Sequence, residues 1–262
     1  MATSCRSCRN SIRQSRRWSP ATHRLVGQDA RNITVGNGQR GEDPAEKALV
    51  DRYAAAVAPI GSRVIGHLAA PAAKAEDNSE SAAADLIADS MLAATAAPEN
   101  GGAQLALVNA SGVRVDVPMG DVRYEQAFAM MPFGNNLLVM TLTGAQLKAA
   151  LEQQYRRALA SGAARPQVLA PSHGFAYTVD MTKPAGERVS EMRLNGKSID
   201  PAARYRVALN NYLASGGDDL SVFTAGTDIT DKSIIDLDAL VEWIAPGRTP
   251  PAPNRIHLIG VP

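Results

Sequence analysis

Cysteine, aromatic residues and ligand-spaced histidines are all scarce in this sequence. Of its 262 residues, only Cys5 and Cys8 are cysteines, four are histidines, and aromatic residues make up 5%. The C-x-x-C pair supplies half of a four-ligand zinc site, and the histidines lie at no ligand spacing. The sequence therefore indicates neither a zinc site nor a disulfide framework, and we interpret the two thiols as incidental.

Long apolar runs are missing as well. No segment approaches the roughly 18 apolar residues of a membrane span, and the N-terminus has no apolar core of a secretory signal. Arg16-Arg17 resembles the start of a twin-arginine signal, but Trp18-Ser19-Pro20 follows where an apolar stretch should stand. As written, the sequence predicts a cytoplasmic protein without a membrane span.

Charge is distributed unevenly along the chain. Residues 1–40 hold eight Arg and no Lys against the single acid Asp29, a net charge of +7, and because the whole chain carries +1 the remainder carries −6. A basic arm of this kind can contact nucleic acid or anionic lipid. The arm has no apolar periodicity, so we expect a disordered basic tail at 1–43 and no nucleic-acid partner.

Helix and strand patterns begin after this tail. Asp43-Pro44-Ala45-Glu46 is typical of a helix start, and the apolar stripe Leu49, Val50, Tyr53 and Val57 predicts a helix that Pro59 ends. Two further helices are predicted, one capped by residues 77–80 and reaching 96, and one capped by 143–146. A final helix is predicted over 235–245. Strands are predicted at 63–68, 104–108, 136–142, 174–179, 189–194, 205–209 and 255–258, with a hairpin turn at Asn195-Gly196. The mixed order indicates the α+β class, with a mixed sheet flanked by helices.

Two loop clusters follow or precede predicted buried strands. Residues 109–114 (NASGVR) combine an amide with a guanidinium that can grip a phosphate or carboxylate through two parallel hydrogen bonds. Residues 131–136 (MPFGNN) place an aromatic ring between Pro and Gly just before a strand. Such a ring either stacks on a ligand base, with a neighbouring Asn on the base edge, or enters the core.

Two more clusters contain glycines beside polar or aromatic residues. In 173–175 (HGF), glycine either lets the backbone approach a ligand or forms a simple turn. Residues 210–220 (NNYLASGGDDL) combine an aromatic ring, a glycine pair and a carboxylate after a strand. This density of glycine and polar residues favours a ligand-binding loop.

In this order, the segments resemble the C-terminal domain of the 5′-nucleotidase and 2′,3′-cyclic phosphodiesterase family. The resemblance covers about residues 44–258. It rests on five segments: ESAAADLIADSM at 80–91, N-x-x-G-x-R at 109–114, PFGN at 132–135, LTGAQLKAALEQ at 142–153 and NYLASGGD at 211–218. It implies an inter-domain linker helix at 44–60 and a nucleotide-binding domain at 61–262, after the disordered tail that the composition of 1–43 predicts.

The resemblance also implies the role of each site residue. It places a base between the rings of Phe133 and Tyr212, with Asn135 and Asp218 beside the base and ribose. Asn109 is implied near the sugar and Arg114 on the phosphate, and Gly174 is implied as a backbone contact to the base. Ser79, Asp219 and Leu220 depart from the family pattern, and Tyr212 replaces the common Phe with a ring that carries a hydroxyl.

Catalysis in this family uses two divalent metal ions held by an N-terminal domain with D-x-H, G-N-H and G-x-H motifs, and none of these occurs here. We therefore expect no catalytic residue and no metal ligand in this chain, which would be a truncated gene product or would work with a metallophosphoesterase domain in trans. Family members are mostly periplasmic, secreted or surface-bound.

Three interpretations of function stay open. The first is a substrate domain that recognises a nucleoside monophosphate for a hydrolase of nucleotide catabolism. The second is a non-catalytic binding or interaction module whose altered 216–219 loop (GGDD) no longer serves nucleotides. In the third, the ligand is a cyclic nucleotide, a nucleotide sugar or another small ester.

Overall fold

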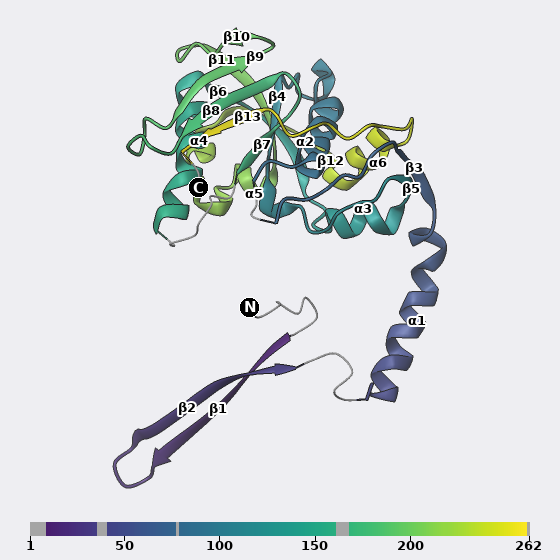
Figure 1. Ribbon diagram of the computed structural model, residues 1–262, viewed down its shortest axis with the longest axis vertical. Coiled ribbons are helices and arrows are strands. Elements are labelled where there is room, and N and C mark those ends of the chain that lie inside the picture. The colour runs from purple at the N-terminus through teal and green to yellow at the C-terminus, as the bar shows by residue number, and fades with distance from the viewer. Residues whose placement is uncertain (1–8, 36–40, 77–78, 161–167, 261–262) are drawn as a thin grey trace. The chain divides into compact units, whose positions relative to one another are not determined.

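The computed structural model of this chain describes residues 9–35, 41–76, 79–160 and 168–260, and it divides into two units, Met1–Val57 and Ala58–Pro262. In the second unit, helices cover both faces of a central mixed sheet (Figure 1). This arrangement confirms the predicted α+β class with a mixed sheet flanked by helices.

The first unit contains a hairpin, where the structure differs from the predicted disordered tail. β1 (Arg9–Ser19) pairs antiparallel with β2 (Arg24–Val35). The prediction rested on the absence of apolar periodicity, whereas antiparallel pairing joins backbone groups and does not require an apolar pattern. Residues 1–8, which include both cysteines, and 36–40 lie outside the described residues.

Helix α1 (Pro44–Gly61) begins where the sequence predicted. The carboxylate of Asp43 accepts hydrogen bonds from Ala45 N at 2.8 Å and Glu46 N at 3.3 Å, which satisfies two donors of the first turn. The helix passes Pro59 instead of ending there, because Ser62 N still donates to Ala58 O at 2.9 Å and closes the last turn. The predicted apolar stripe is present but exposed, and no residue of α1 is buried.

A five-stranded sheet with the order β12-β6-β11-β4-β7 forms the centre of the second unit. β11 pairs parallel with β4, whereas β6 and β12 add antiparallel on one side and β7 adds antiparallel on the other. The strands are β4 (Leu105–Asn109), β6 (Asn136–Thr143), β7 (Leu169–Pro171), β11 (Arg204–Asn210) and β12 (Thr227–Ile235).

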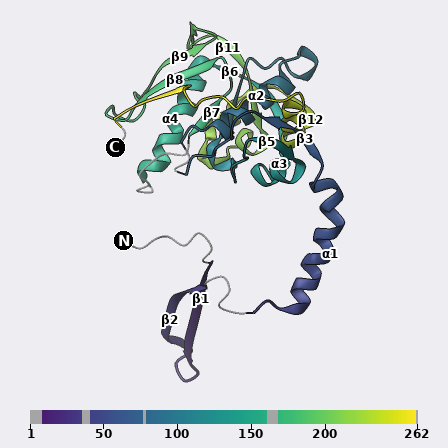
Figure 2. The same ribbon diagram turned by 45° about the vertical axis from the view of Figure 1, so that its right-hand side comes forward.

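Both faces of this sheet are covered, so β4 is buried at every position. Ala106 and Val108 face a core layer with α2 (Ala82–Thr95), and Leu105 and Leu107 face the opposite layer with α4 (Gly144–Ala160). The view in Figure 2 shows α2 and α4 separated by the sheet strands. The continuous apolar run that predicted a buried strand is thus the signature of a sheet between two helix layers.

A second sheet has the order β10-β9-β8-β13. β8 (Phe175–Asp180), β9 (Val189–Leu194) and β10 (Lys197–Ser198) form an antiparallel meander, and β13 (Ile256–Ile259) closes it as the predicted edge strand, parallel to β8. Asn195 and Gly196 turn between β9 and β10 with φ of 50° and 76°, as the Asn-Gly prediction requires.

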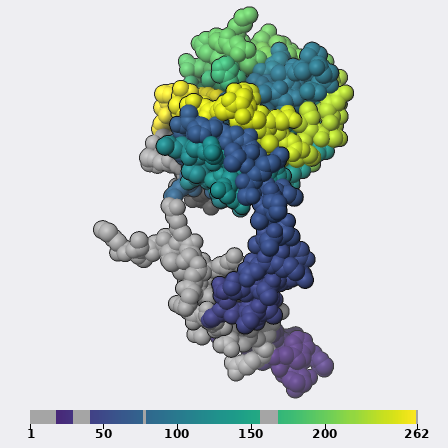
Figure 3. Space-filling model, turned by 90° about the vertical axis from the view of Figure 1, so that its right-hand side faces the viewer, coloured from purple at the N-terminus to yellow at the C-terminus, as the bar shows by residue number. Residues whose placement is uncertain are grey.

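Smaller elements complete the unit. β3 (Val64–Leu68) pairs with β5 (Gly120–Arg123), and α3 (Tyr124–Met130) and α6 (Asp236–Ile244) pack nearby. The C-terminal segment contacts β3, because Arg248 N donates to His67 O at 2.9 Å. In Figure 3, yellow C-terminal residues accordingly lie beside blue residues. The remaining short helices are η1 (Pro98–Asn100), η2 (Ala110–Gly112), α5 (Asn211–Ala214), η3 (Gly217–Asp219) and η4 (Ser221–Ala225).

The first turn of α4 is capped by side chains near in sequence, whereas at α2 a side chain that was predicted to cap the helix binds a distant segment. At α4, Thr143 Oγ1 accepts from Gln146 N and Gln146 Oε1 accepts from Thr143 N, which confirms the predicted capping box. At α2 the cap is Ser81 rather than residues 77–80, of which 77 and 78 lie outside the described residues. Glu80 instead accepts from the backbone N–H groups of Arg255 and Ile256, so its side chain binds a distant segment.

Candidate functional site

One cavity of about 380 Å³ lies at an edge of the five-stranded sheet, and six of the seven predicted site residues line it. The directions of the sheet strands explain why these six residues meet. β4 and β11 are parallel and β6 is antiparallel to both, so the carboxyl ends of β4 and β11 and the amino end of β6 meet at one edge. The lining residues are Ile87, Val108, Asn109, Ser111, Gly112, Arg114, Met131, Phe133, Asn135, Asn210, Tyr212, Asp218 and Asp236.

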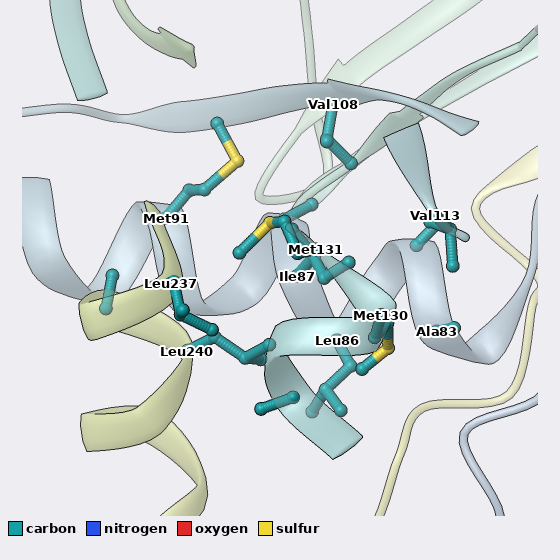
Figure 4. Close-up of a cluster of buried hydrophobic side chains, with 14 of the residues drawn as sticks. Ala83, Leu86, Ile87, Met91, Val108, Val113, Met130, Met131, Leu237 and Leu240 are labelled. Carbon is teal, nitrogen blue, oxygen red and sulfur yellow. The ribbon is translucent and has the colours of Figure 1, made fainter. Parts of the chain in front are cut away.

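The floor of the cavity belongs to the apolar core. Ile87, Val108 and Met131 are buried, and in Figure 4 their side chains lie close together between α2 and β4. Such an apolar floor under polar walls is typical of small-molecule pockets, because the floor excludes water while the walls provide orientation.

Asn109 is the last residue of β4 and is buried at the centre of a polar network. Its Nδ2 donates to Ser111 Oγ at 3.0 Å and to Asp218 Oδ2 at 3.2 Å, while its Oδ1 accepts from Asn210 Nδ2 at 3.3 Å. Asn210 also caps α5 by accepting from Leu213 N at 2.8 Å. The ends of β4 and β11 are therefore tied to each other through their terminal asparagines.

Asp218 and Tyr212 form the second part of this network. Tyr212 Oη donates to Asp218 Oδ1 at 2.9 Å, and Ser111 Oγ donates to Asp218 Oδ2 at 3.3 Å. Asp218 and Asp219 both adopt the left-handed region, with φ of 55° and 61°. This conformation is uncommon for residues other than glycine and is held here by the surrounding hydrogen bonds.

Phe133 is the second aromatic residue of the cavity, and 53% of its surface is exposed. The guanidinium carbon of Arg114 lies 5.9 Å from the centre of its ring, and Arg114 Nη1 donates to Ser111 O at 3.3 Å. Tyr212 is 45% exposed. Both rings thus offer apolar surface to solvent, and both line the same cavity.

Asp236 is a cavity residue that the sequence did not predict. Only 1% of its surface is exposed, and its carboxylate accepts from Asn135 Nδ2 at 3.0 Å and from Leu237 N at 2.8 Å. Burial raises the pKa of Asp236, while the hydrogen bonds from Asn135 and Leu237 act in the opposite direction. The sequence predicted a helix over 235–245 but gave Asp236 no role at a site, because the polar strand β12 that places it beside β6 was not predicted.

Gly174 is the one predicted residue that the structure does not bring to this cavity. β7 runs antiparallel to β4, with Asn109 opposite Leu169, so the chain after β7 leaves at the other edge of the sheet. Gly174 instead lines a separate hollow with His173 and Arg255. Its φ of 86° serves the turn into β8, where its carbonyl accepts from Asn195 N at 2.7 Å.

The part of the chain that the structure describes does not suit a metal centre. Within it, no group of three or more His, Cys, Asp or Glu side chains is arranged to hold a metal ion. The two divalent ions that the family resemblance implies therefore do not fit these residues. Separately, none of the described helices is long and apolar enough to cross a membrane.

The chemistry of the cavity suits a planar molecule with hydroxyl groups and a negative charge. Two rings offer stacking surfaces, the Asn109 and Asp218 network offers donors and acceptors, and Arg114 offers a cation. Other charged groups at the cavity are the carboxylates of Asp218 and Asp236.

Comparisons with known proteins identify the family of this chain. The family described as "5′-nucleotidase, C-terminal domain" matches residues 64–225. The trifunctional nucleotide phosphoesterase protein YfkN of Bacillus subtilis is 38% identical over 165 residues, which cover 61% of this chain and 11% of that protein. A 5′-nucleotidase-related protein of Glossina morsitans morsitans is 30% identical over 197 residues, which cover 69% of this chain and 35% of the relative.

Among solved structures, the 5′-nucleotidase precursor of Thermus thermophilus superposes with a TM-score of 0.74 at 27% identity. The match covers 96% of this chain and 50% of that chain. This chain therefore spans half or less of the length of the relatives described. Because the family match extends over more than half of its residues, the chain belongs to the 5′-nucleotidase C-terminal domain family.

Proposed function

We propose that this chain binds a nucleotide in the cavity at the Asn109 edge of the sheet and acts as the substrate domain of a 5′-nucleotidase-type phosphoester hydrolase. The observation that carries the proposal is the pair of half-exposed rings, Phe133 and Tyr212, on one cavity. A base stacked on an aromatic side chain gains about 1–3 kcal/mol, and every base has a suitable face.

The polar residues support the same ligand. Asn109, Ser111 and Asp218 form a network of donors and acceptors that can pair with the hydroxyl groups of a sugar, and Arg114 supplies the cation for a phosphate. We assign the role beside the base to Asn135. A nucleoside monophosphate is the simplest molecule with all three parts, and a cyclic nucleotide or nucleotide sugar shares the same base and ribose.

Hydrolysis requires more than these residues provide. The described residues do not suit a metal ion, so we propose that the two metals are held by a metallophosphoesterase domain that works with this one, in a longer protein or in trans. The role assigned to the residues of this chain is recognition of the substrate.

Thermal unfolding with and without nucleoside monophosphates tests the proposal. At a ligand concentration of 100 Kd, binding to the folded state adds about 2.7 kcal/mol to stability, which raises Tm measurably. The double substitution Phe133→Ala and Tyr212→Ala should abolish the increase. Phe128→Ala is the matched control, because Phe128 is similarly exposed but does not line the cavity.

One observation favours the alternative of a binding module that no longer serves nucleotides. The carboxylate of Asp218 already accepts hydrogen bonds from Asn109, Ser111 and Tyr212, so a ligand hydroxyl must compete with the protein's own donors. If no nucleoside monophosphate, cyclic nucleotide or nucleotide sugar raises Tm, the substrate-domain proposal fails and this alternative takes its place.

A further inference from the structure

Asn210 joins two parts of the cavity wall through the two ends of one side-chain amide. Its Oδ1 accepts from Leu213 N at 2.8 Å and caps α5, the short helix that carries Tyr212. Its Nδ2 donates to Asn109 Oδ1 at 3.3 Å, at the end of the neighbouring strand β4. Only 6% of the surface of Asn210 is exposed, so both contacts lie away from bulk water.

The helix cap fixes the direction of the Asn210 amide. Turning this amide by 180° would set its amino group against the N–H of Leu213 and its oxygen against Asn109 Oδ1. Donors would then meet donors and acceptors would meet acceptors, which is unfavourable, and more so in a buried place. The cap at α5 therefore determines that Asn210 presents an N–H to Asn109.

This direction is passed on to the amide of Asn109. Because Asn210 donates, the oxygen of Asn109 turns towards it, and the amino group of Asn109 lies on the other side. The two hydrogens of that amino group go to Ser111 Oγ at 3.0 Å and to Asp218 Oδ2 at 3.2 Å. A reversed Asn109 amide would set its oxygen against the carboxylate of Asp218, and the contact that holds this carboxylate would become repulsive.

We propose that Asn210 is a positioning residue of the nucleotide site, which sets the direction of the Asn109 amide and thereby holds the Asp218 carboxylate in place for the hydroxyl groups of the sugar. The inference rests on the proposed nucleotide-binding function and adds to it a residue that acts through Asn109. The same side chain caps the helix of Tyr212, so one amide aligns the sugar side and the ring side of the cavity.

Asn210→Asp reverses one contact and keeps the other. The introduced carboxylate still accepts from Leu213 N, but it sets an acceptor against Asn109 Oδ1 and so favours the reversed Asn109 amide. At about pH 8, affinity for adenosine 5′-monophosphate should fall about tenfold or more, because buried acceptors are left unpaired. Protonation restores a donor, and since burial raises the pKa of a carboxyl group, affinity should recover towards the wild-type value by about pH 5.

Asn211→Asp is the matched control. It adds the same charge one residue further along the chain, at an exposed position that does not line the cavity. Affinities are compared as ratios to the wild type at each pH, because the Asp218 carboxylate is present in all three chains. The control should keep a constant ratio, whereas the ratio for Asn210→Asp should rise as pH falls. A purely structural role of Asn210 would lower affinity without this pH profile.

A nucleotide without sugar hydroxyl groups provides a second readout. The ligand 2′,3′-dideoxyadenosine 5′-monophosphate keeps the base and the phosphate, and isothermal titration compares it with the ribonucleotide. If Asn210 acts through Asp218, Asn210→Asp should weaken the dideoxy nucleotide much less than the ribonucleotide. An equal loss with both ligands would make the role of Asn210 structural and overturn the inference.

The outcomes separate this inference from the proposed function. If Asn210→Asp does not fold, Asn210→Ser decides, because its hydroxyl group can cap the helix but is too short to hold Asn109. It should weaken the ribonucleotide and spare the dideoxy nucleotide. Equal wild-type affinity for the two nucleotides, or an Asn210→Asp variant with wild-type affinity at every pH, overturns the inference while nucleotide binding stands. Absence of binding by both nucleotides overturns the proposed function, and this inference with it.

Discussion

The hydroxyl group of Tyr212 both donates to and accepts from Asp218. Its oxygen lies 2.9 Å from Asp218 Oδ1 and 3.1 Å from the backbone nitrogen of Asp218. This double contact closes the glycine loop 216–217 against the ring, and it fixes the plane that the ring presents to the cavity. A phenylalanine at this position would stack in the same place but could not hold the loop.

Replacing Tyr212 separates the contribution of the ring from that of the hydroxyl. Tyr212→Phe should lower the free energy of unfolding by about 1 kcal/mol, the usual net value of a hydrogen bond, and weaken nucleotide binding less than tenfold. Tyr212→Ala should weaken binding further, because stacking is lost as well. Titration calorimetry and urea unfolding measure both effects, and equal affinities of the Phe and Ala variants would contradict a stacking role.

Gly217 is predicted to tolerate no side chain. A Cβ at this position would lie 2.6 Å from the Tyr212 ring and from the Tyr212 carbonyl oxygen, and the backbone atom cannot give way easily. Gly217→Ala should therefore destabilise the chain by about 1–3 kcal/mol and weaken nucleotide binding, since the ring must move. Gly41→Ala serves as the control in the same unfolding experiment, because nothing lies within 4 Å of its Cβ.

Arg114→Ala should discriminate between a nucleotide and its nucleoside. If Arg114 contacts the phosphate, the variant loses affinity for a nucleoside monophosphate and keeps its affinity for the nucleoside. The loss should shrink as salt is raised, because screening already weakens the wild-type contact. An equal loss of affinity for the nucleotide and the nucleoside would contradict a phosphate contact. It would instead place Arg114 beside the base, since its guanidinium carbon lies 5.9 Å from the ring centre of Phe133.

Stability should depend on pH through Asp85. This side chain is fully buried, its Oδ2 lies 3.7 Å from Arg255 Nε, and Arg255 is already paired with Asp89 at 2.8 Å. Burial raises the pKa of Asp85 to about 8, against an opposing effect of Arg255. Between the ordinary carboxyl pKa and about 8, the folded chain holds a proton that the unfolded chain releases, so stability falls as pH rises through this window.

Asp85→Asn mimics the protonated form at every pH. The variant should gain stability over the wild type as pH rises from about 5 to about 8, by at most about 1.4 kcal/mol per pH unit, and the difference should level off above the folded pKa. Urea unfolding at three pH values measures it. A difference that stays constant across the window would show that Asp85 is ionised throughout.

Local sequence patterns determined the elements whose hydrogen bonds close within a few residues. The Thr143 and Gln146 capping box and the Asn195-Gly196 turn appear as predicted, because both partners of each contact are near in sequence. The buried strand β4 was also predictable, since a strand covered on both faces is apolar throughout. The polar strand β12 carries no such pattern and was missed.

The loop clusters of the sequence and the family resemblance named six of the thirteen residues that line the cavity, all near the ends of predicted strands. Only the tertiary structure decided which ends meet. The antiparallel direction of β7 sends Gly174 to the opposite edge, and the pairing of β12 with β6 brings Asp236 to Asn135. Strand order and direction are set by packing between distant segments, and no local hydrogen bond or periodicity encodes that packing.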